Sequence, residues 1–526
     1  MLSRILGCVL HGIAGNIVEV ETFISNGIPS LEIIGQGDST IKESRERVKA
    51  AIKNSGFEFP NRKIVVNLSP ALLRKQGTGF DLPIALGILV ASGQVILNTE
   101  DIFKSSMFLG ELSLDGSVKG VRGVISMMLE AQRHSIKKVF VAEENYKEAS
   151  IVEDIVIVGV KSLKDVISLL YCEPPPRVQV RKRKSPVSKL PDFSEVKGHA
   201  EAKRALEIAA SGGHSILMLG SPGSGKTMLA RCLSGILPEM NYSEALETTQ
   251  IFSICSKNSI SGLISKRPFR APHHSSTLTS LTGGGRFPKP GELSLAHNGV
   301  LFLDELPEFK GEALEALRQP LEDGVITVSR LFSSEEFPSK VMLVCAANPC
   351  RCGMLFDEGR CRCTPYQKAE YLSKISGPLL DRIDMNIQVA SVSFSQIDSS
   401  EKGEKSAEIR ERVNSARKIQ ERRFKNEVFN CNGWLPLKLF KKYCLLSAEA
   451  GDVLERVYSN KNFSGREYTR VIRVARTIAD MDCCETIEVK HISEAIQFKQ
   501  LKWGEEFDYA GKSDSMDLVF TDKRSK

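Results

Sequence analysis

The segment that most constrains this chain is a glycine-rich loop that directly follows a short apolar run. Residues 216–219 are apolar, and Gly220, Gly225, Lys226 and Thr227 then match the pattern G-x-x-x-x-G-K-[ST]. In such a loop backbone N–H groups converge on phosphate oxygens, the lysine reaches the β- and γ-phosphates, and the threonine hydroxyl binds Mg²⁺. The sequence therefore predicts an α/β fold that binds ATP and Mg²⁺. The complete predicted nucleotide-binding loop comprises Gly220, Ser221, Pro222, Gly223, Ser224, Gly225, Lys226 and Thr227.

Two more apolar runs end in polar side chains that suit ATP hydrolysis. The run 300–303 ends at Asp304 and Glu305, where the first carboxylate can bind Mg²⁺ and the second can activate the attacking water. The run 341–346 leads to Asn348, whose amide either orients that water or caps the following turn. These residues complete a predicted ATPase site.

Length and composition indicate several soluble domains. The 526 residues exceed a single core and predict about two to four domains. Hydrophobic residues make up 42% and charged residues 26%, and no apolar run reaches the length of a membrane span, so we expect no membrane partner. Thirteen cysteines, an odd number, fit reduced thiols in the cytoplasm better than a disulfide framework. The net charge of +7 permits a nucleic-acid partner without establishing one.

The clearest domain boundary is a basic, proline-rich segment at residues 173–191. Its prolines remove hydrogen-bond donors and its basic residues repel one another, so we expect an extended linker, which is also able to touch phosphates as a basic strap. Around it the pattern predicts an α/β domain at 1–172, an ATPase module at 192–392, a helical lid at 393–503 and a flexible tail at 504–526.

Hydrophobic periodicity predicts the elements of these domains. Strands are expected at the start of the chain and at 63–68, 139–142, 155–160, 216–219, 300–303 and 341–346. Helices are expected at 41–55, 83–91, 124–134, 407–424, 447–457, 467–480 and 489–498, with another that begins at Lys226.

Several longer stretches resemble one protein family. RPFRAPHH at 267–274, the segment 290–307 and GPLLDRID at 377–384 closely resemble the YifB/ComM family of magnesium-chelatase-like AAA+ ATPases, and the resemblance extends to about residue 500. It implies a central AAA+ P-loop α/β module and a C-terminal helical lid of the magnesium-chelatase type. The blocks at 42–52, 66–70, 80–87 and 110–116 resemble the Lon-peptidase-like N-terminal α/β domain of this family.

The N-terminal domain lacks the residues that a Lon peptidase needs. A working site requires a nucleophilic serine and a lysine base. Alignment on the Lon pattern puts Gly77 at the serine position and Ile125 near the lysine position. We therefore expect an inactive domain that serves binding or assembly.

The resemblance also assigns arginines to the ATPase site. Arg382 resembles the arginine finger that reaches the nucleotide of the neighbouring subunit, while the residues alone favour an ordinary surface ion pair with Asp381 or Asp384. Arg466 resembles the sensor-2 arginine at the start of a lid helix, and Arg473 is the alternative. A finger that acts in trans implies a homo-oligomeric ring, and related proteins are hexamers.

Two segments resemble insertions that project into the central pore of related motors. Residues 255–291 are similar to the helix-2 insert, and residues 325–341 to a hairpin before the sensor strand. The adjacent His273 and His274 fit packing or phosphate contacts better than metal binding. The basic residues expected to contact DNA from these segments are Lys266, Arg267, Arg270, Arg286, Lys289 and Arg330.

The resemblance implies a cytoplasmic DNA motor, a helicase for branch migration of recombination intermediates during uptake of foreign DNA. The alternative is the ATPase subunit of a chelatase-type complex that inserts magnesium into a porphyrin. The N-terminal domain argues against this alternative, because magnesium-chelatase motor subunits lack it.

Four cysteines lie close together just after Asn348. Cys350 and Cys352 form one C-x-C pair, and Cys361 and Cys363 form another. Two thiolate pairs joined by a short polar loop can close a tetrahedral Zn²⁺ site, although the C-x-C spacing is tighter than the usual C-x-x-C. The alternative is a group of free or redox-active thiols. The interleaved arginines, which are expected to lower the thiol pKa values, are Arg351, Arg360 and Arg362.

Overall fold

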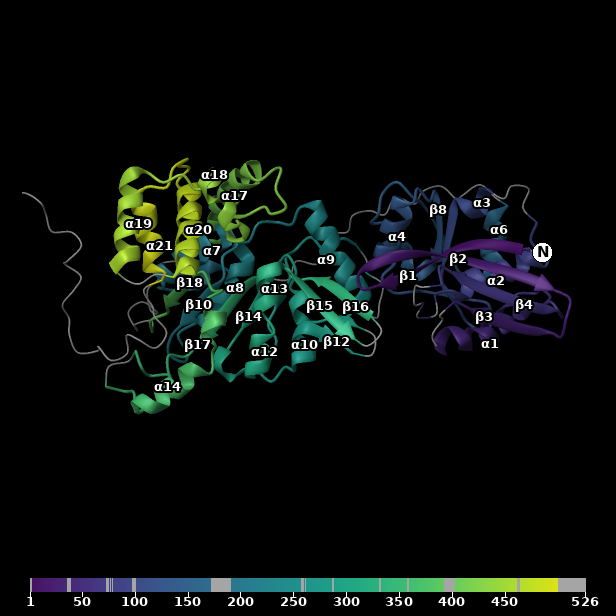
Figure 1. The fold of residues 1–526 in the computed structure, drawn as a ribbon, viewed down its shortest axis with the longest axis horizontal. Helices are drawn as coiled ribbons and strands as arrows, with labels where there is room; N and C mark the ends of the chain where they lie inside the picture. The colour runs from purple at the N-terminus through teal and green to yellow at the C-terminus, as the bar shows by residue number, and fades with distance from the viewer. Residues whose placement is uncertain are drawn as a thin grey trace, which may run out of the picture.

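In the computed structural model, a central module separates an N-terminal α/β domain from a helical lid (Figure 1). The predicted linker 173–191, except its last residue, the tail 504–526 and Arg286 lie outside the described residues. The domain boundaries stay predictions. The structure describes residues 2–35, 39–71, 75, 77, 79–96, 101–171, 191–256, 260, 262–285, 288–330, 333–356, 359–391, 403–460 and 464–499.

The N-terminal domain contains a seven-stranded mixed sheet in the order β3-β4-β2-β1-β5-β8-β9. Its β1–β2 and β2–β4 pairs are antiparallel, and the other pairs are parallel. In β4, buried side chains alternate with partly exposed ones, as expected for a strand with one face on the core. The strands are β1 (Leu2–His11), β2 (Ala14–Ser25), β3 (Ser30–Ile34), β4 (Lys63–Ser69), β5 (Ser106–Leu109), β8 (Lys138–Ala142) and β9 (Val156–Val160).

Helices cover this sheet, and one of them lies inside the core. Ten of the eleven residues of α2 are buried, because its sequence is apolar on nearly every side. Helix α6 begins at a capping box in which Ser162 and Asp165 satisfy each other's backbone N–H groups. The helices are α1 (Ser39–Asn54), α2 (Asp81–Ala91), α4 (Val124–Arg133), α5 (Tyr146–Ala149) and α6 (Leu163–Leu170).

The central module contains a five-stranded parallel sheet in the order β11-β14-β17-β10-β18. All residues of β10, β14 and β17 are buried, which explains why these strands read as continuous apolar runs. The strands are β10 (Ile216–Leu219), β11 (Phe269–Arg270), β14 (Val300–Leu303), β17 (Met342–Ala347) and β18 (Met385–Gln388). The helices are α7 (Ala200–Gly212), α8 (Lys226–Ile236), α9 (Tyr242–Cys255), α10 (Leu278–Thr282), α11 (Glu292–Leu295), α12 (Gly311–Glu315), α13 (Arg318–Asp323), α14 (Pro365–Ser373) and α15 (Gly377–Leu380).

Two short hairpins extend the central module. The β12–β13 pair (Gly283–Gly284 and Lys289–Pro290) lies between α10 and α11, and the β15–β16 hairpin (Val325–Arg330 and Ser333–Pro338) precedes β17. The prediction for 325–341 is therefore confirmed as a hairpin. The prediction that all of 255–291 forms an insertion is wrong, because β11 within it pairs with β14 as an edge strand of the main sheet.

The C-terminal helices share a hydrophobic core with the central sheet. One cluster contains Ile216 of β10, Ile409 of α17 and Ile472 of α20. Figure 1 shows α19, α20 and α21 together at the end of the molecule away from the N-terminus. The lid therefore packs on the module as one folded unit. Its helices are α17 (Ser406–Arg423), α18 (Phe440–Tyr443), α19 (Ala448–Asn460), α20 (Gly465–Met481) and α21 (Val489–Gln497).

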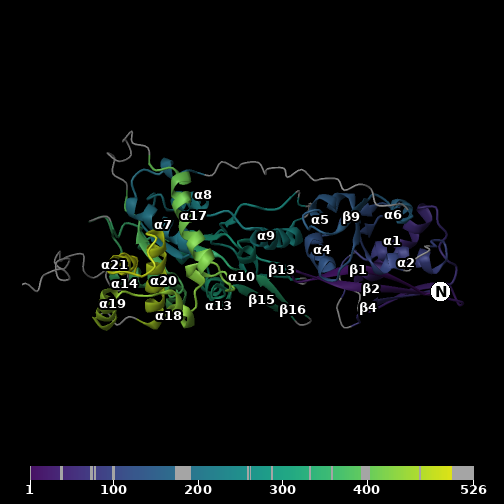
Figure 2. The same cartoon turned by 90° about the horizontal axis from the view of Figure 1, so that it is seen from above.

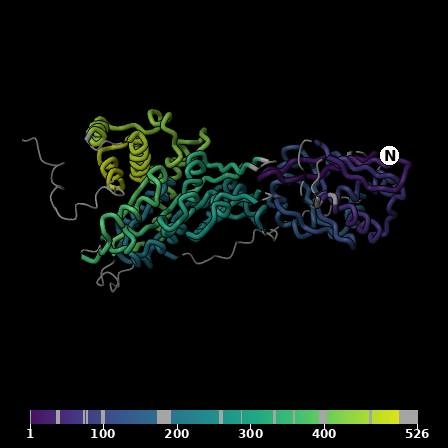
Figure 3. Tube along the Cα trace, turned by 60° about the horizontal axis from the view of Figure 1, so that its bottom comes forward, coloured from purple at the N-terminus to yellow at the C-terminus, as the bar shows by residue number. Residues whose placement is uncertain are grey.

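Among the described residues, the N-terminal domain contacts the central module through the β1–β2 turn and through several residues around α9. The β1–β2 turn reaches β16, where the His11 Nδ1 lies 3.0 Å from the Glu335 Oε2. The second contact joins α4 and α9, where the Gly123 N–H donates to the Ser253 carbonyl oxygen over 3.3 Å. Figures 2 and 3 show the N-terminal domain next to the central module from two further directions.

Most predicted elements are confirmed. The strands at 216–219 and 300–303 have the predicted bounds, and the other predicted helices and strands agree within a few residues. The edge strands β3, β11 and β18 are not among the predicted strands, because β11 has only two residues and the short sequences of β3 and β18 mix polar with apolar side chains.

Candidate functional site

The phosphate-binding loop connects β10 to α8 as predicted. Gly223 and Gly225 have φ angles of +79° and +83°, which a residue with a Cβ rarely adopts, so both positions favour glycine. The Lys226 Nζ donates to the carbonyl oxygens of Gly220 at 2.8 Å and Ser221 at 2.9 Å. Burial lowers the pKa of Lys226, and the nearby Asp304 carboxylate opposes this shift. The lysine is thus fixed at the loop.

The predicted Mg²⁺ ligands and the sensor asparagine converge on this loop. The Thr227 hydroxyl donates to the Asp304 Oδ2 at 2.8 Å, and the Lys226 Nζ lies 3.3 Å from the Asn348 Oδ1. The carboxyl ends of β10, β14 and β17 meet at one edge of the sheet, which is why residues far apart in sequence meet here. An ammonium, a hydroxyl and a carboxylate beside a glycine loop fit a nucleotide with Mg²⁺.

Glu305 has a partner that the sequence did not predict. The His274 Nδ1 lies 3.2 Å from the Glu305 Oε2, so the two side chains form an ion pair when the imidazole ring is protonated. The strand register explains the contact. Arg270 of β11 pairs with Leu301 of β14, and His274 and Glu305 each lie four residues after these paired residues. Glu305 also has a φ of +53°, an unusual value for a residue other than glycine.

The position of His274 relative to the sheet has a direct consequence. In the order β11-β14-β17-β10, β11 lies on the side of β14 away from the phosphate loop. The contact with His274 therefore lies on the side of β14 that is away from β10 and its loop. The expectation of packing for the two histidines holds for their rings, whose centroids lie 4.0 Å apart.

Arg382 and Arg466 lie at the amino ends of the parallel strands, whereas the phosphate loop lies at their carboxyl ends. Arg382 precedes β18, whose first residue pairs with Ile216 at the start of β10, whereas the loop follows the end of β10. The two arginines line a cavity of about 330 Å³. Arg470 and Arg473 line it too, which the i, i+4, i+7 spacing from Arg466 on α20 explains. None of the residues lining this cavity belongs to the phosphate loop.

The hydrogen bonds of Arg382 differ from the predicted surface pair. Its side chain is only 11% exposed, and its Nη2 lies 2.8 Å from the Glu322 Oε1. It also donates to the carbonyl oxygens of Arg318 at 2.9 Å and Pro378 at 2.7 Å. Arg466 instead takes the pairing expected for Arg382, with its Nη1 3.4 Å from the Asp381 Oδ2, and its side chain is 58% exposed.

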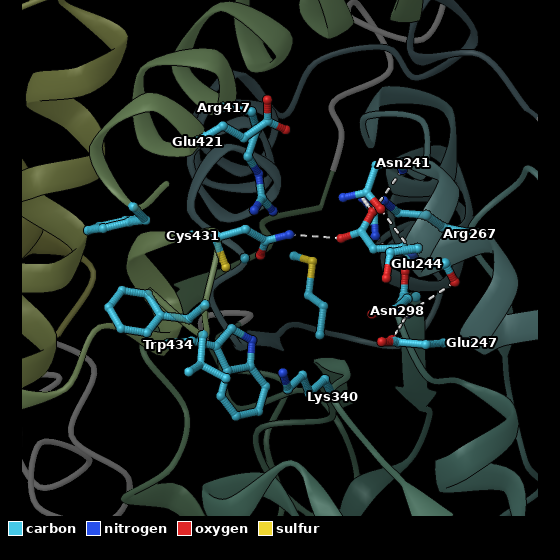
Figure 4. A pocket seen from close by; sticks show the side chains of 18 of the residues that line it. Asn241, Glu244, Glu247, Arg267, Asn298, Lys340, Arg417, Glu421, Cys431 and Trp434 are labelled. Carbon is cyan, nitrogen blue, oxygen red and sulfur yellow. Dashed lines mark hydrogen bonds and ion pairs between the residues drawn. The ribbon is translucent and has the colours of Figure 1, made fainter. Parts of the chain in front are cut away.

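Two of the predicted DNA-contacting arginines are engaged within the subunit. The Arg267 guanidinium donates to the Glu244 Oε2 at 2.8 Å and to the carbonyl oxygens of Pro238 and Asn298. Arg267 lines a cavity of about 510 Å³, which Figure 4 shows from close by. Arg270 forms a bidentate pair with Glu292 at 2.6 and 2.7 Å. The prediction that these two supply free pore charge is therefore wrong, and Lys266 and Lys289 remain exposed. The side chain of Arg330 lies outside the described part of the chain.

The four clustered cysteines meet as predicted. The Cys350 Sγ lies 3.3 Å from the Cys352 Sγ and 3.8 Å from the Cys361 Sγ, and all four Sγ atoms, including that of Cys363, lie within 4.8 Å of one another. A tetrahedral zinc with Zn–S bonds of about 2.3 Å requires S···S separations of about 3.8 Å. The cluster therefore has nearly the size of a Cys₄ zinc site. Every cysteine that the structure describes is a free thiol.

The expected effect of the neighbouring arginines on these thiols is not the main one. The pKa of Cys352 is lowered to about 6, chiefly by a hydrogen bond from the Met354 backbone N–H. Burial raises the pKa of Cys350 to about 12. A backbone hydrogen bond at Cys352 and burial at Cys350, more than the charge of the arginines, thus determine the pKa shifts of these two thiols.

The whole chain matches known relatives. It is 41% identical over 487 residues to the uncharacterized protein YifB of Escherichia coli strain K12, and the alignment covers 92% of this chain and 94% of that protein. It is 40% identical to the competence protein ComM of Haemophilus influenzae, with 93% of this chain and 96% of that protein covered. The chain belongs to the YifB/ComM family of magnesium-chelatase-like proteins.

Matches to family descriptions agree with the three parts of this YifB/ComM chain. Residues 192–397 match magnesium chelatase, subunit ChlI, residues 20–145 match subunit ChlI of Mg-chelatase, and residues 403–499 match the C-terminal part of subunit ChlI. A stretch covering 31% of the chain is 25% identical to the Lon protease of Mycolicibacterium smegmatis. The expected fold class is confirmed. Within the described residues, no helix combines the length and apolar character that crossing a bilayer requires.

Proposed function

We propose that this protein hydrolyses ATP at the interfaces of a hexameric ring and uses the energy to move DNA. The observation that carries the proposal is the separation of two half-sites within one subunit. Lys226, Thr227, Asp304 and Asn348 meet at one edge of the sheet, while Arg382 and Arg466 face a cavity at the other edge. A complete site is then formed only when two subunits meet.

Each residue at the phosphate-loop edge has a role that its position supports. Lys226 and the loop N–H groups of Gly223 and Gly225 bind the phosphates of the substrate ATP. Thr227 and Asp304 hold Mg²⁺, which neutralises phosphate charge when bound. Glu305 takes the proton of the attacking water once it has turned from His274, and Asn348 orients that water.

The arginines at the opposite edge complete the site of the neighbouring subunit. Strand β10 spans four residues, or about 13 Å, between the two edges. Arg382 therefore acts on a neighbour's nucleotide, and it must exchange Glu322 for the γ-phosphate when subunits assemble. Arg466, which is more exposed, enters the same site as the sensor-2 arginine, and Arg473 is the alternative in the same cavity.

DNA is the proposed substrate of the motor. The full-length relative of Haemophilus influenzae is a competence protein, which supports a role as a branch-migration helicase in recombination during transformation. The exposed Lys266 and Lys289 are the described basic residues left to contact DNA phosphates from the first insertion.

The test is the ATPase rate with and without single-stranded and branched DNA, beside a Lys226→Ala variant. Stimulation by DNA that the variant abolishes is the expected result. Because phosphate contacts are strongest at low salt, a protein that binds no DNA there would contradict the proposal.

A chelatase subunit remains the alternative function. All three family descriptions name a chelatase subunit, including that of residues 20–145, so the N-terminal domain alone does not separate the two functions. The relatives that match over the full length favour the DNA motor, because one of them is a competence protein. ATPase activity that responds to a porphyrin and not to DNA would favour the alternative.

We also propose a structural zinc ion at Cys350, Cys352, Cys361 and Cys363. The S···S separations of 3.3–3.8 Å among three of these thiols support it, because they approach the edges of a tetrahedron around zinc. Elemental analysis of protein purified without chelator should find about one zinc per subunit. A metal-free protein with full activity would contradict this assignment.

A further inference from the structure

The cysteine loop packs directly against the phosphate-binding loop. Gly353 lies in the cysteine loop with a φ of +78°, and its N–H donates to the Cys350 carbonyl oxygen over 2.9 Å. A Cβ at this position would lie 2.5 Å from the Cδ and 2.6 Å from the Cγ of Pro222. The turn that carries the first two cysteines therefore rests on the proline ring of the phosphate loop.

The same loop is tied to the end of the sensor strand on both sides. Cys350 follows Asn348 by two residues, and the Asn348 Oδ1 accepts from the Lys226 Nζ at 3.3 Å. After Cys363 the chain enters α14, where the Tyr371 hydroxyl accepts a hydrogen bond from the Asn348 backbone N–H. Both ends of the cysteine loop thus lead to the residue that faces the phosphate-binding lysine.

We propose that zinc held by the four cysteines braces the phosphate-binding loop, so that zinc occupancy sets the affinity of the site for ATP. This inference rests on the proposed ATPase and on the proposed zinc site. Four metal–sulfur bonds fix the two C-x-C pairs relative to each other, and metal binding supplies folding free energy to such a loop. The turn at Gly353 is then held against Pro222, and a phosphate loop held in its binding conformation loses less entropy when ATP binds.

Zinc removal tests the brace on the full-length protein. The dissociation constant of a fluorescent, slowly hydrolysed ATP analogue is measured for zinc-loaded protein, for protein stripped with a chelator and for stripped protein reloaded with zinc. Stripping should weaken binding at least about fivefold, and reloading should restore it.

The outcomes separate this inference from the two proposals beneath it. Equal affinities of loaded and stripped protein overturn the brace. Protein that never binds zinc overturns the zinc site, and zinc-loaded protein that binds no analogue overturns the ATPase.

Two glycines of the same loop provide a matched pair of variants. Gly353 and Gly359 have φ angles of +78° and +72°, so alanine brings similar backbone strain to both. A Cβ at Gly359 meets none of the described atoms beyond its chain neighbours within 4 Å, whereas a Cβ at Gly353 meets Pro222. Gly353→Ala should therefore weaken analogue binding about five- to tenfold more than Gly359→Ala, with zinc content preserved in both. Equal effects of the two variants overturn the brace.

Pro222→Ala approaches the contact from the other loop and leaves the cysteine loop unchanged. It should lower analogue affinity by itself, and in its background Gly353→Ala should cost less, because the ring that the new methyl group meets is gone. Strict additivity of the two substitutions overturns the proposal. The single Pro222→Ala variant keeps the test decisive if Gly353→Ala fails to retain zinc, and unchanged affinity of that single variant contradicts the brace.

Discussion

Replacing His274 with alanine should raise the rate at which the protein hydrolyses ATP without DNA. The His274 Nδ1 holds the Glu305 Oε2 at 3.2 Å on the side of β14 away from the phosphate loop. In the proposed mechanism, Glu305 activates water only when its carboxylate turns toward Lys226 and Asn348. Loss of the contact with His274 should therefore increase the fraction of time that Glu305 spends in that position.

The exposure of the two side chains sets the size of this effect. The contact is an ion pair between side chains that are 35% and 55% exposed, and such exposed pairs contribute only about 0.5–1 kcal/mol because solvent screens them. This corresponds to about a two- to fivefold increase in kcat. The KM for ATP should stay unchanged, because none of the described contacts of His274 involves the phosphate loop.

The assay is steady-state ATP hydrolysis over a range of ATP concentrations, with His273→Ala as the matched control. The His273 Nδ1 contacts the Ser275 hydroxyl at 2.8 Å, so this variant leaves the ion pair of His274 with Glu305 in place and should change kcat less. His274→Asn keeps an N–H donor and should restore part of the restraint. A fall in kcat for His274→Ala, or the same change in both alanine variants, would refute the reasoning.

Two further substitutions test the environments of two cations, Arg267 and Lys499. Arg267→Ala leaves the Glu244 carboxylate without its cationic partner and should lower the free energy of unfolding by about 3 kcal/mol, while the salt dependence of DNA binding stays unchanged. Thermal unfolding and DNA titrations measure both quantities, with the exposed Lys266→Ala as the control, and a stable variant with weakened DNA binding would show that Arg267 contacts DNA. Burial lowers the pKa of Lys499 from 10.5 to about 7. Between these values the unfolded chain binds a proton that the folded chain does not, so stability should rise with pH by up to about 1.4 kcal/mol per pH unit. Lys499→Met should flatten that rise in denaturation curves at pH 7 to 9, and an identical pH dependence of both proteins would contradict the shift.

The parts of the fold that are continuous in sequence could be predicted. The strands at 216–219 and 300–303 are buried on both faces, and a parallel sheet brings their carboxyl ends to one edge, so the meeting of Thr227 and Asp304 follows from the motifs. The pair of Arg267 with Glu244 could not be predicted, because it depends on how α9 packs beside β11.

The contact of His274 with Glu305 could be predicted only in part. Once β11 and β14 are known to pair, the register places the two residues opposite each other. Strand β11 has only two residues, which is too few to show a hydrophobic period. The sequence therefore does not predict that His274 lies beside Glu305. The contact of Gly353 with Pro222 depends on the packing of two loops and has no sequence signal.

The central claim is that each ATPase site is shared by two subunits, and mixed rings test it most directly. Lys226→Ala lacks the phosphate-loop half of the site and Arg382→Ala lacks the arginine half, so each variant alone should be inactive in ATP hydrolysis. In an equal mixture, about a quarter of the interfaces combine an intact Lys226 with an intact Arg382, and about a quarter of the wild-type ATPase rate should return. A mixture as inactive as its components, or an Arg382→Ala protein that hydrolyses ATP normally by itself, would contradict the shared site.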